Sequence, residues 1–303
     1  MSRPEVRIYE VGPRDGLQAE TTIVPTDGKL RFIALLAEAG LREIEATSFV
    51  RPEAIPQLAD ADALMAGLER RPGVRYPVLV PNQHGLERAI AAGADAICLF
   101  TAATDAYATA NIRMTIDESL AAFAPIVESA RQRGTWIRAY LSAAFGCPYS
   151  GEVEAGAVVS VSDRLLRLGV DELSISDTVG VATPTDLRRV LGALSTAGIG
   201  AEVVALHLHD TRGTALANVM TALELGIRCF DASTGGTGGS PYAPGSAGNL
   251  ATEDLVYLLD REGVRTGVGL DGVLSAARFI AAQLGRGVGS KVGRAGGWPQ
   301  ATA

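Results

Sequence analysis

The sequence lacks the features that mark several classes of protein. No apolar run approaches the roughly 20 residues needed to span a bilayer, and the segment 1–5 lacks the apolar core of a signal peptide. The net charge is −7, which argues against nonspecific nucleic-acid binding but not against an anionic substrate. We therefore expect a cytoplasmic protein that binds neither membranes nor nucleic acids.

Cysteine is also scarce. The three cysteines, Cys98, Cys147 and Cys229, cannot all pair and lack the spacing of a zinc site. This is consistent with a reducing compartment, where a buried free cysteine is an ordinary small hydrophobic residue. No linker or low-complexity insert divides the chain, so we expect one domain over residues 1–303.

Histidine is as rare, and two of the three histidines lie in one motif. His207 and His209 end an apolar run, so both side chains point to the same side of a strand. Neutral imidazole is the commonest ligand for divalent metals, although one ring could instead pack in a core while the other caps a helix. Asp15, a hard oxygen ligand after an earlier apolar strand, and the glycine-rich loop at 235–249 favour a metal site. We interpret the third histidine, His84, as a solvent-exposed residue.

Eight short apolar runs alternate with amphipathic patterns along the chain. The runs cover residues 6–9, 43–47, 75–80, 96–100, 136–141, 172–176, 203–207 and 228–232. Helical spacing of apolar residues covers 29–39, 118–132, 156–168, 184–194 and 213–225. Eight such units predict an α/β fold, a (β/α)8 TIM barrel over about residues 5–262. A short helical extension at 271–284 and a loose, glycine-rich tail from residue 285 make up the rest, about 263–303.

The candidate functional residues fall where a barrel would gather them. Asp15 follows the first predicted strand, Glu45 lies near the end of the second, and Asp177 follows the sixth. His207 and His209 end the seventh strand, and the catalytic groups of TIM barrels lie at the carboxyl ends of the strands. A doubly wound open sheet is the competing fold, but only a closed barrel brings the first and seventh strands together.

Several longer blocks of sequence carry a family resemblance. They cover residues 10–18 (EVGPRDGLQ), 45–50 (EATSFV), 80–82 (VPN), 146–149 (GCPY), 177–180 (DTVG), 207–211 (HLHDT) and 245–257 (GSAGNLATEDLVY). On these blocks, which run in the family's order between residue 6 and about residue 290, the chain resembles the 3-hydroxy-3-methylglutaryl-CoA lyases. Those lyases belong to a metallolyase group built on a TIM barrel, and the resemblance suggests a homodimer.

The resemblance implies roles for individual residues. Asp15, His207, His209 and Asn249 match the ligands of a divalent metal, and Arg14 matches the catalytic arginine. Mg²⁺ or Mn²⁺ suits a site of carboxylate, amide oxygen and imidazole, and the two histidines make Zn²⁺ or Co²⁺ the alternatives. Taken alone, Arg14 and Asp15 could instead form an ordinary ion pair in a turn.

Other polar residues near the strand ends have two interpretations. Glu45 is either a substrate-site carboxylate or a salt-bridge partner at the end of a strand. Asp177 and Thr178 either belong to the active site or cap the next helix. Tyr140 and Ser142 alternate on the fifth strand and face either the substrate or the core. We include Glu45 and Asp177 among the candidate catalytic residues.

One residue departs from the family. The lyases carry a catalytic cysteine directly before Pro-Tyr-Ala in the glycine-rich loop, where this chain has Ser240. A thiol with a pKa of about 8.5 exchanges a proton near neutrality, whereas a serine hydroxyl needs a partner to act as a base. Ser240 remains a candidate catalytic residue, and His207 or a metal-bound hydroxide is the other candidate for the base.

The expected reaction is a retro-Claisen cleavage of a short branched 3-hydroxyacyl-CoA. Loss of the C3 hydroxyl proton and cleavage of the C2–C3 bond leave an enolate, whose oxygen Arg14 can stabilise while the metal lowers the pKa of the hydroxyl. The resemblance implies 3-hydroxy-3-methylglutaryl-CoA as the substrate and acetyl-CoA and acetoacetate as the products, as in leucine degradation. The alternatives are a related substrate such as citramalyl-CoA, a Claisen-type condensing enzyme, or a barrel that binds acyl-CoA without turnover.

Overall fold

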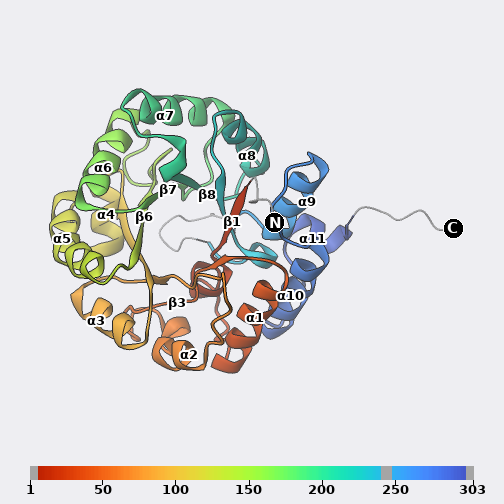
Figure 1. Cartoon of the computed structure of the whole chain (residues 1–303). Helices are drawn as coiled ribbons and strands as arrows, with labels where there is room; N and C mark the ends of the chain where they lie inside the picture. Colours follow the sequence, from red (N-terminus) through yellow and green to blue (C-terminus); the bar gives the residue numbers. More distant parts are fainter. Residues whose placement is uncertain (1–5, 240–247, 298–303) are drawn as a thin grey trace.

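The structure, a computed structural model, describes residues 6–239 and 248–297. Parallel strands form a ring that helices surround (Figure 1). The strands are β1 (Arg7–Glu10), β2 (Glu43–Ile44), β3 (Thr47–Ser48), β4 (Val78–Leu79), β5 (Ala96–Ala102), β6 (Trp136–Ser142), β7 (Glu172–Asp177), β8 (Val204–Leu208) and β9 (Cys229–Ala232). They pair in the order β2-β1-β9-β8-β7-β6-β5-β4-β3.

The ring closes because β2 and β3 are two parts of one barrel strand. Glu45 and Ala46 separate the two parts, yet both residues keep their strand neighbours. The backbone N–H of Glu45 donates to the Glu10 carbonyl of β1 (2.8 Å), and that of Ala46 donates to the Pro77 carbonyl beside β4 (2.9 Å). The predicted TIM barrel is therefore confirmed, and the open sheet is excluded.

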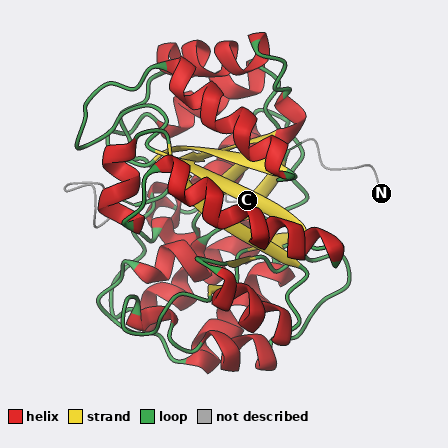
Figure 2. Cartoon of the chain, turned by 90° about the vertical axis from the view of Figure 1, so that its left-hand side faces the viewer, coloured by secondary structure: helices red, strands yellow, loops and turns green. Residues whose placement is uncertain are grey.

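Helices cover the outside of this ring (Figure 2). They are α1 (Thr26–Glu38), α2 (Ala61–Gly67), α3 (Gln83–Ala91), α4 (Asp105–Ile112), α5 (Ile116–Gln132), α6 (Ala155–Leu168), α7 (Pro184–Thr196), α8 (Ala215–Glu224), α9 (Thr252–Arg261), α10 (Leu270–Gln283) and α11 (Lys291–Ala295). Their apolar spacing explains which face packs on the strands, since α6 buries Val158, Val161 and Leu165 at positions three and four apart. None of the described helices is long and apolar enough to cross a bilayer.

The strands bury side chains on both faces. On β5, Ile97 and Leu99 join the large apolar cluster between strands and helices, whereas Cys98 belongs to a small separate cluster with Tyr9 and Tyr140. The Tyr9 hydroxyl lies 3.1 Å from the Cys98 sulfur, although β1 and β5 are not neighbours in the sheet. The small cluster therefore lies inside the barrel. Burial on both faces explains why the strands read as apolar runs.

Charged side chains of alternating sign also run through the barrel, and we call them the ionic chain. Its members, in order of contact, are Arg75, Glu43, Arg7, Glu172, Arg138 and Asp231. Arg7 and Glu172 are the first residues of their strands, whereas Arg138 and Asp231 lie two residues further along theirs. The Arg138 and Asp231 side chains are wholly buried, whereas that of Arg7 is 40% exposed. The ionic chain thus leads from solvent at the amino ends of the strands into the barrel.

Two predicted strands differ from the structure. The run at 43–47 is split into β2 and β3, and the run at 75–80 shortens to β4. Only an isolated bridge joins Arg75 to Glu43 ahead of β4. Pro77 explains the shortening, because it has no N–H to donate to a ladder.

The carboxyl-terminal segment also differs from expectation. Helix α10 packs against α1 and α9 and so completes the helical ring (Figure 1). The segment 285–297 does not form a loose tail, because α11 packs on α9 and polar side chains anchor its start. The Ser290 hydroxyl donates a hydrogen bond to the buried carboxylate of Glu253, and the Lys291 ammonium pairs with Asp210. The prediction of a loose tail is therefore wrong for these residues.

Candidate active site and metal centre

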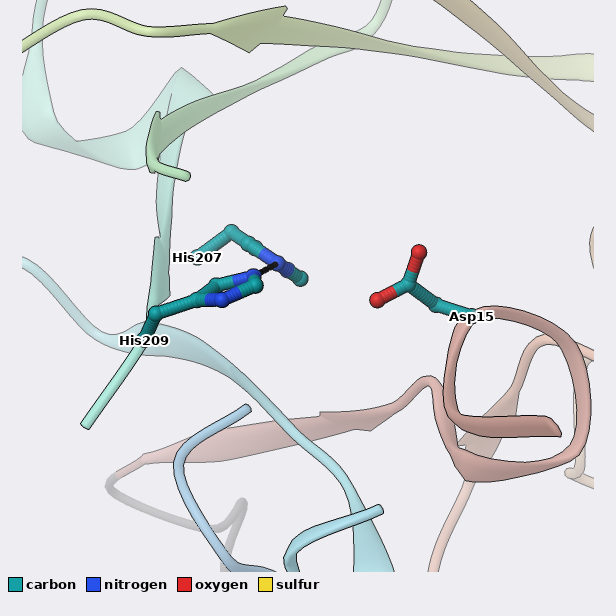
Figure 3. A group of neighbouring side chains, drawn as sticks. All are labelled: Asp15, His207 and His209. Carbon is teal, nitrogen blue, oxygen red and sulfur yellow. Dashed lines mark hydrogen bonds between the residues drawn. The ribbon is translucent and has the colours of Figure 1, made fainter. Parts of the chain in front are cut away.

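Three side chains with metal-ligand chemistry meet at the carboxyl end of the barrel. His207 belongs to β8, His209 follows it, and Asp15 lies in the turn Gly12–Gly16 after β1. Figure 3 shows the Asp15 carboxylate facing the two imidazole rings. Their ligand atoms all lie within 4.8 Å of one another. The structure thus brings together three of the four predicted ligands, from β1 and β8, which flank β9 in the sheet.

The spacing of the two imidazoles suits a shared cation. Their Nε2 atoms lie 3.2 Å apart. Two nitrogens bound at about 2.1 Å to one ion, with an angle of about 90–110° between them, would be roughly 3.0–3.4 Å apart. The pair can therefore bind one ion without large movement.

Asn249, the fourth predicted ligand, lies beside the other three. Its side-chain amide donates hydrogen bonds to Asp15 Oδ2 (2.9 Å) and to the Thr237 carbonyl (3.1 Å). An isolated bridge joins Asn249 to His209. Within the described residues, the buried Oδ1 atom of Asn249 has no hydrogen-bond partner. A buried acceptor without a donor is costly, and a hard cation would satisfy it, so these residues fit a divalent metal.

The charge state of the site also suits a cation. Burial and the neighbouring His207 lower the pKa of His209 to about 3, more than Asp15 raises it. Burial alone would raise the pKa of the Asp15 carboxyl, but Arg14 and the two histidines outweigh it, so this pKa lies below its ordinary value. A neutral imidazole and an ionised carboxylate are the ligand forms that bind divalent metals.

Arg14 is held between the metal ligands and a buried carboxylate. Its Nε and Nη2 donate to the two oxygens of Glu45 (2.8 and 3.1 Å), and its Nη1 donates to Asp15 Oδ1 (2.7 Å). The Tyr140 hydroxyl donates to the same Glu45 carboxylate, and the guanidinium lies 5.1 Å from the Tyr140 ring centre. Glu45 is wholly buried, and it is the salt-bridge partner of Arg14 at the end of β2. It fixes the direction of Arg14, and Tyr140 faces this site.

Asp177 reaches the same end of the barrel in a different role. Its carboxylate oxygens accept hydrogen bonds from the backbone N–H groups of Val181 (3.0 Å) and Ala182 (2.9 Å). The hydroxyl of Thr178 accepts one from the N–H of Ala143 (3.0 Å). Helix α7 begins with its own capping box at Thr183. Asp177 and Thr178 therefore organise loops ahead of α7 and do not cap it, and the catalytic role of Asp177 stays a prediction.

Ser240 lies outside the described residues. The chain entering the glycine-rich loop packs closely on the metal ligands, because Gly238 has φ +97° and a Cβ there would lie 2.6 Å from the Asn249 amide nitrogen. Only glycine fits this approach at low cost. A glycine is therefore needed at position 238, because the backbone there lies against the side chain of Asn249.

Two buried carboxylates that the sequence analysis did not single out hold the turn Thr234–Gly236 ahead of this loop. Glu10 accepts hydrogen bonds from Thr234 N–H (2.9 Å) and from the hydroxyls of Thr234 and Thr252 (2.7 Å each). Glu253 accepts from the N–H of Gly235 (3.0 Å) and from the Ser290 hydroxyl. Burial raises the pKa of Glu253 to about 7. Glu10 could have been identified from the sequence, because it is a charged residue at the end of an apolar run.

Asp231 is a further residue that sequence reasoning missed. Its Oδ2 atom lies 3.2 Å from His207 Nδ1, and Arg138 donates to its Oδ1. Burial would raise the pKa of the Asp231 carboxyl, but Arg138 and His207 outweigh it and keep this pKa below its ordinary value. Single charged residues within the apolar runs 136–141 and 228–232 were the signal that could have identified this pair.

The three cysteines are all buried but differ in their surroundings. Cys98 and Cys229 are buried, and burial raises the pKa of each thiol well above its ordinary value. Cys147 lines a cavity of about 540 Å³ between the loops that follow β6 and β7. Burial would raise the pKa of this thiol, but hydrogen bonds from Ser150 and Thr104 lower it below its ordinary value. Cys147 is therefore the thiol most open to reaction among the three.

Comparison with known proteins agrees with this geometry. Residues 5–280 match the model of the HMGL-like family. The chain is 47% identical over 291 residues to a mitochondrial hydroxymethylglutaryl-CoA lyase of Bos taurus, covering 96% of this chain and 89% of the relative. It is also 47% identical over 290 residues to a cytoplasmic 3-hydroxy-3-methylglutaryl-CoA lyase of Rattus norvegicus, covering 96% and 84%. A solved HMG-CoA lyase of Acinetobacter baumannii, in complex with coenzyme A and 3-methylmalate, superposes with a TM-score of 0.94 at 39% identity, covering 98% and 97%.

Proposed function

The chain belongs to the HMGL-like family, and on that basis we propose that its metal is held by Asp15, His207, His209 and Asn249. The protein is a carbon–carbon lyase that cleaves 3-hydroxy-3-methylglutaryl-CoA to acetyl-CoA and acetoacetate. The observation that carries the assignment of the site is the convergence of the three ligand groups within 4.8 Å, beside an arginine fixed by Glu45.

The enzyme works with a divalent metal, as its family does, and we propose Mg²⁺ or Mn²⁺. A carboxylate and a carboxamide oxygen suit these hard ions, and two imidazoles make Mn²⁺ the better match of the two. When bound, the cation polarises the substrate oxygens and lowers the pKa of the C3 hydroxyl. The orphaned Oδ1 atom of Asn249 supports its inclusion in the ligand set.

Arg14 is proposed to stabilise the charge that forms during bond cleavage. The C3 hydroxyl loses its proton, the C2–C3 bond breaks, and its electron pair moves into the thioester enolate, which then takes a proton at C2. The enolate oxygen carries the developing charge. A guanidinium held by Glu45 and Asp15 at fixed geometry offers donors to that oxygen without reorganisation during the reaction.

The contacts of His207 argue against it as the proton acceptor. Its Nδ1 faces Asp231 and its Nε2 faces His209 and the proposed metal position. With both nitrogens engaged, His207 has no free lone pair for the substrate while it binds the metal. We therefore assign proton transfer to Ser240 or to solvent, and keep His207 as a ligand.

A second candidate substrate rests on one observation, the serine at position 240 where the lyase family has a cysteine. A site adapted to another hydroxyacyl-CoA could use a different proton acceptor. The Acinetobacter lyase bound to coenzyme A and 3-methylmalate supports testing branched malyl thioesters. Citramalyl-CoA and 3-methylmalyl-CoA are the two substrates to compare.

The deciding experiment is a coupled assay of acetyl-CoA release, or of pyruvate or glyoxylate release for the malyl thioesters, on a panel of hydroxyacyl-CoAs. We expect 3-hydroxy-3-methylglutaryl-CoA to be cleaved in the presence of Mg²⁺ or Mn²⁺. Faster cleavage of a malyl thioester would replace the proposed substrate and keep the metal site. Absence of cleavage on the whole panel, with metal bound, would overturn the assignment as a lyase.

We also propose a cytoplasmic homodimer. The cytoplasmic relative from Rattus norvegicus supports the location, and a mitochondrial relative of equal identity makes cell fractionation the deciding measurement. The family resemblance supports the dimer, and light scattering on the purified protein tests it.

A further inference from the structure

We propose that Asp231 and Arg138 are positioning residues for the metal, which hold His207 in the tautomer whose Nε2 lone pair faces the cation. This inference rests on the proposed function, since it takes His207 as a metal ligand. It adds two residues from inside the barrel to a site otherwise built at its mouth.

The register of the sheet places Asp231 directly behind His207. The two residues are paired neighbours on β9 and β8, and His207 Nδ1 lies 3.2 Å from Asp231 Oδ2. The same oxygen accepts a hydrogen bond of 2.9 Å from the Ser174 hydroxyl. Oδ1 in turn accepts a hydrogen bond from Arg138, so both carboxylate oxygens act as acceptors and the contact places a proton on Nδ1 of His207. A neutral His207 then carries its lone pair on Nε2, toward His209 and Asp15.

Arg138 holds the Asp231 carboxylate in place. The guanidinium donates to Asp231 Oδ1, and its Nε lies 3.4 Å from Glu172 Oε1. The guanidinium carbon lies 3.7 Å from the ring centre of Tyr9 and 5.3 Å from that of Tyr140. Two aromatic faces and two carboxylates therefore fix a planar cation, which leaves the Asp231 carboxylate little freedom to rotate away from His207.

Stability alone does not explain this pair. A buried ion pair gains little over well-packed apolar residues of the same volume, because both charges lose their hydration. An ion pair inside the barrel is therefore better explained by a use for its charge. The charge of Asp231 has such a use one contact away, where it orients His207. Partners of this kind typically change metal affinity 10–100-fold.

Calorimetric titration of the metal-free full chain with Mn²⁺ tests the proposal. In Asp231→Asn the amide can rotate and donate to Nδ1, so the other tautomer of His207 becomes accessible. We expect its dissociation constant for Mn²⁺ to rise 10–100-fold. The matched control is Glu43→Gln, which removes a buried charge at the solvent end of the ionic chain and contacts neither Arg138 nor His207. We expect its Mn²⁺ affinity to stay within about twofold of the wild type.

The outcomes separate positioning from mere structural support. If Asp231→Asn binds Mn²⁺ as tightly as the wild type, or if both variants weaken binding equally, the proposal is overturned. A wild type that binds Mn²⁺ but cleaves no hydroxyacyl-CoA would overturn the proposed function alone. A wild type that binds no Mn²⁺, Mg²⁺, Zn²⁺ or Co²⁺ would overturn both.

A second measurement covers the case in which Asp231→Asn does not fold. The chain has three histidines, so ¹⁵N-histidine NMR of the metal-free wild type resolves the tautomer of each ring. The His84→Gln variant identifies one signal set, and His207→Gln identifies the set of interest. We expect the neutral form of His207 to carry its proton on Nδ1. A proton on Nε2 alone would overturn the proposal.

Discussion

Asn249 and Asp15 are 234 positions apart in the sequence, yet the Asn249 amide donates a hydrogen bond of 2.9 Å to Asp15 Oδ2. The contact joins the turn after the first barrel strand to the segment after the last one. It also orients the carboxamide, because the Asn249 nitrogen is held by Asp15 and Thr237 while its oxygen stays unpaired among the described residues. Closure of the barrel is therefore what assembles the ligand set.

The first prediction concerns the metal. Removal of divalent ions with a chelator should abolish turnover, and Mg²⁺ or Mn²⁺ should restore it, because the proposed ligands cannot polarise substrate without a cation. A crystal structure with bound metal should place the four ligands at about 2.0–2.6 Å from one ion. Asn249→Ala should weaken metal binding, whereas the exposed His84→Ala should leave it unchanged.

Full turnover by a preparation shown by elemental analysis to be metal-free would contradict this prediction. Equal metal affinity of Asn249→Ala and the wild type would remove Asn249 from the ligand set and leave the other three in place.

The second prediction concerns Arg14. Arg14→Gln or Arg14→Met should lower kcat about 100- to 1,000-fold or more, roughly 3–4 kcal/mol, with a small change in KM. The reason is that the charge it stabilises exists mainly in the transition state. Steady-state kinetics measure the split, and the exposed Arg188→Gln is the control for loss of one positive charge.

Because Arg14→Met leaves Glu45 buried without its main partner, its thermal midpoint must be measured alongside. A variant with raised KM and unchanged kcat would show that Arg14 only binds the substrate.

The third prediction concerns Ser240. If loss of the family's thiol limits the reaction, Ser240→Cys should raise kcat on 3-hydroxy-3-methylglutaryl-CoA and make turnover sensitive to thiol-alkylating reagents. Cys147 lines a cavity and has a lowered thiol pKa, so it would react as well. The alkylation test should therefore use a Cys147→Ser background, in which the parent protein should be insensitive.

A wild type that already turns over at about 10 per second or more, with no gain from the cysteine, would show that Ser240 does not limit the reaction. If the wild type then cleaves another hydroxyacyl-CoA efficiently, its active site is adapted to that substrate.

The fourth prediction concerns pH and stability. The pKa of Glu253 is about 7 in the folded protein, against an ordinary value of 4.5. Between these values the folded state keeps a proton that the unfolded state has lost, so this stabilising contribution is full below about pH 4.5 and disappears as pH rises to about 7. The total is up to about 3 kcal/mol.

Urea unfolding of the wild type and Glu253→Gln between pH 5 and 8 measures this contribution. We expect the variant to gain stability relative to the wild type as pH rises, because glutamine does not titrate. The exposed Glu262→Gln should show no such trend. A difference that is constant with pH would contradict the raised pKa.

Much of the site could be predicted from the sequence because its chemistry is local. The two-residue spacing of His207 and His209 sets their common face on a strand, and Arg14 and Asp15 are adjacent at a strand end. Barrel topology then brings these short motifs together without further information. Asn249 was found through the family resemblance and not through any spacing.

The residues that were missed make their contacts across the barrel. Asp231 and Arg138 stand among apolar residues, Glu253 lies between Thr252 and Asp254, and the partners of all three are far away in sequence. No periodicity marks such pairs, because their meeting depends on the register of non-adjacent segments. The anchored tail was missed for the same reason, since Ser290 finds Glu253 only in the folded protein.

The ionic chain has a consequence for how this barrel can change over evolutionary time. Each inner member pairs with two neighbours, so a single substitution deep in the barrel leaves an uncompensated buried charge that typically costs about 3–5 kcal/mol. Replacing a neighbouring acid and base together removes that penalty, and the double change should be better tolerated than the sum of its single steps. Adjacent members of the chain should therefore be inherited as pairs, and a deep mutational scan of the barrel interior should show strong positive epistasis between Arg138 and Asp231 in protein abundance.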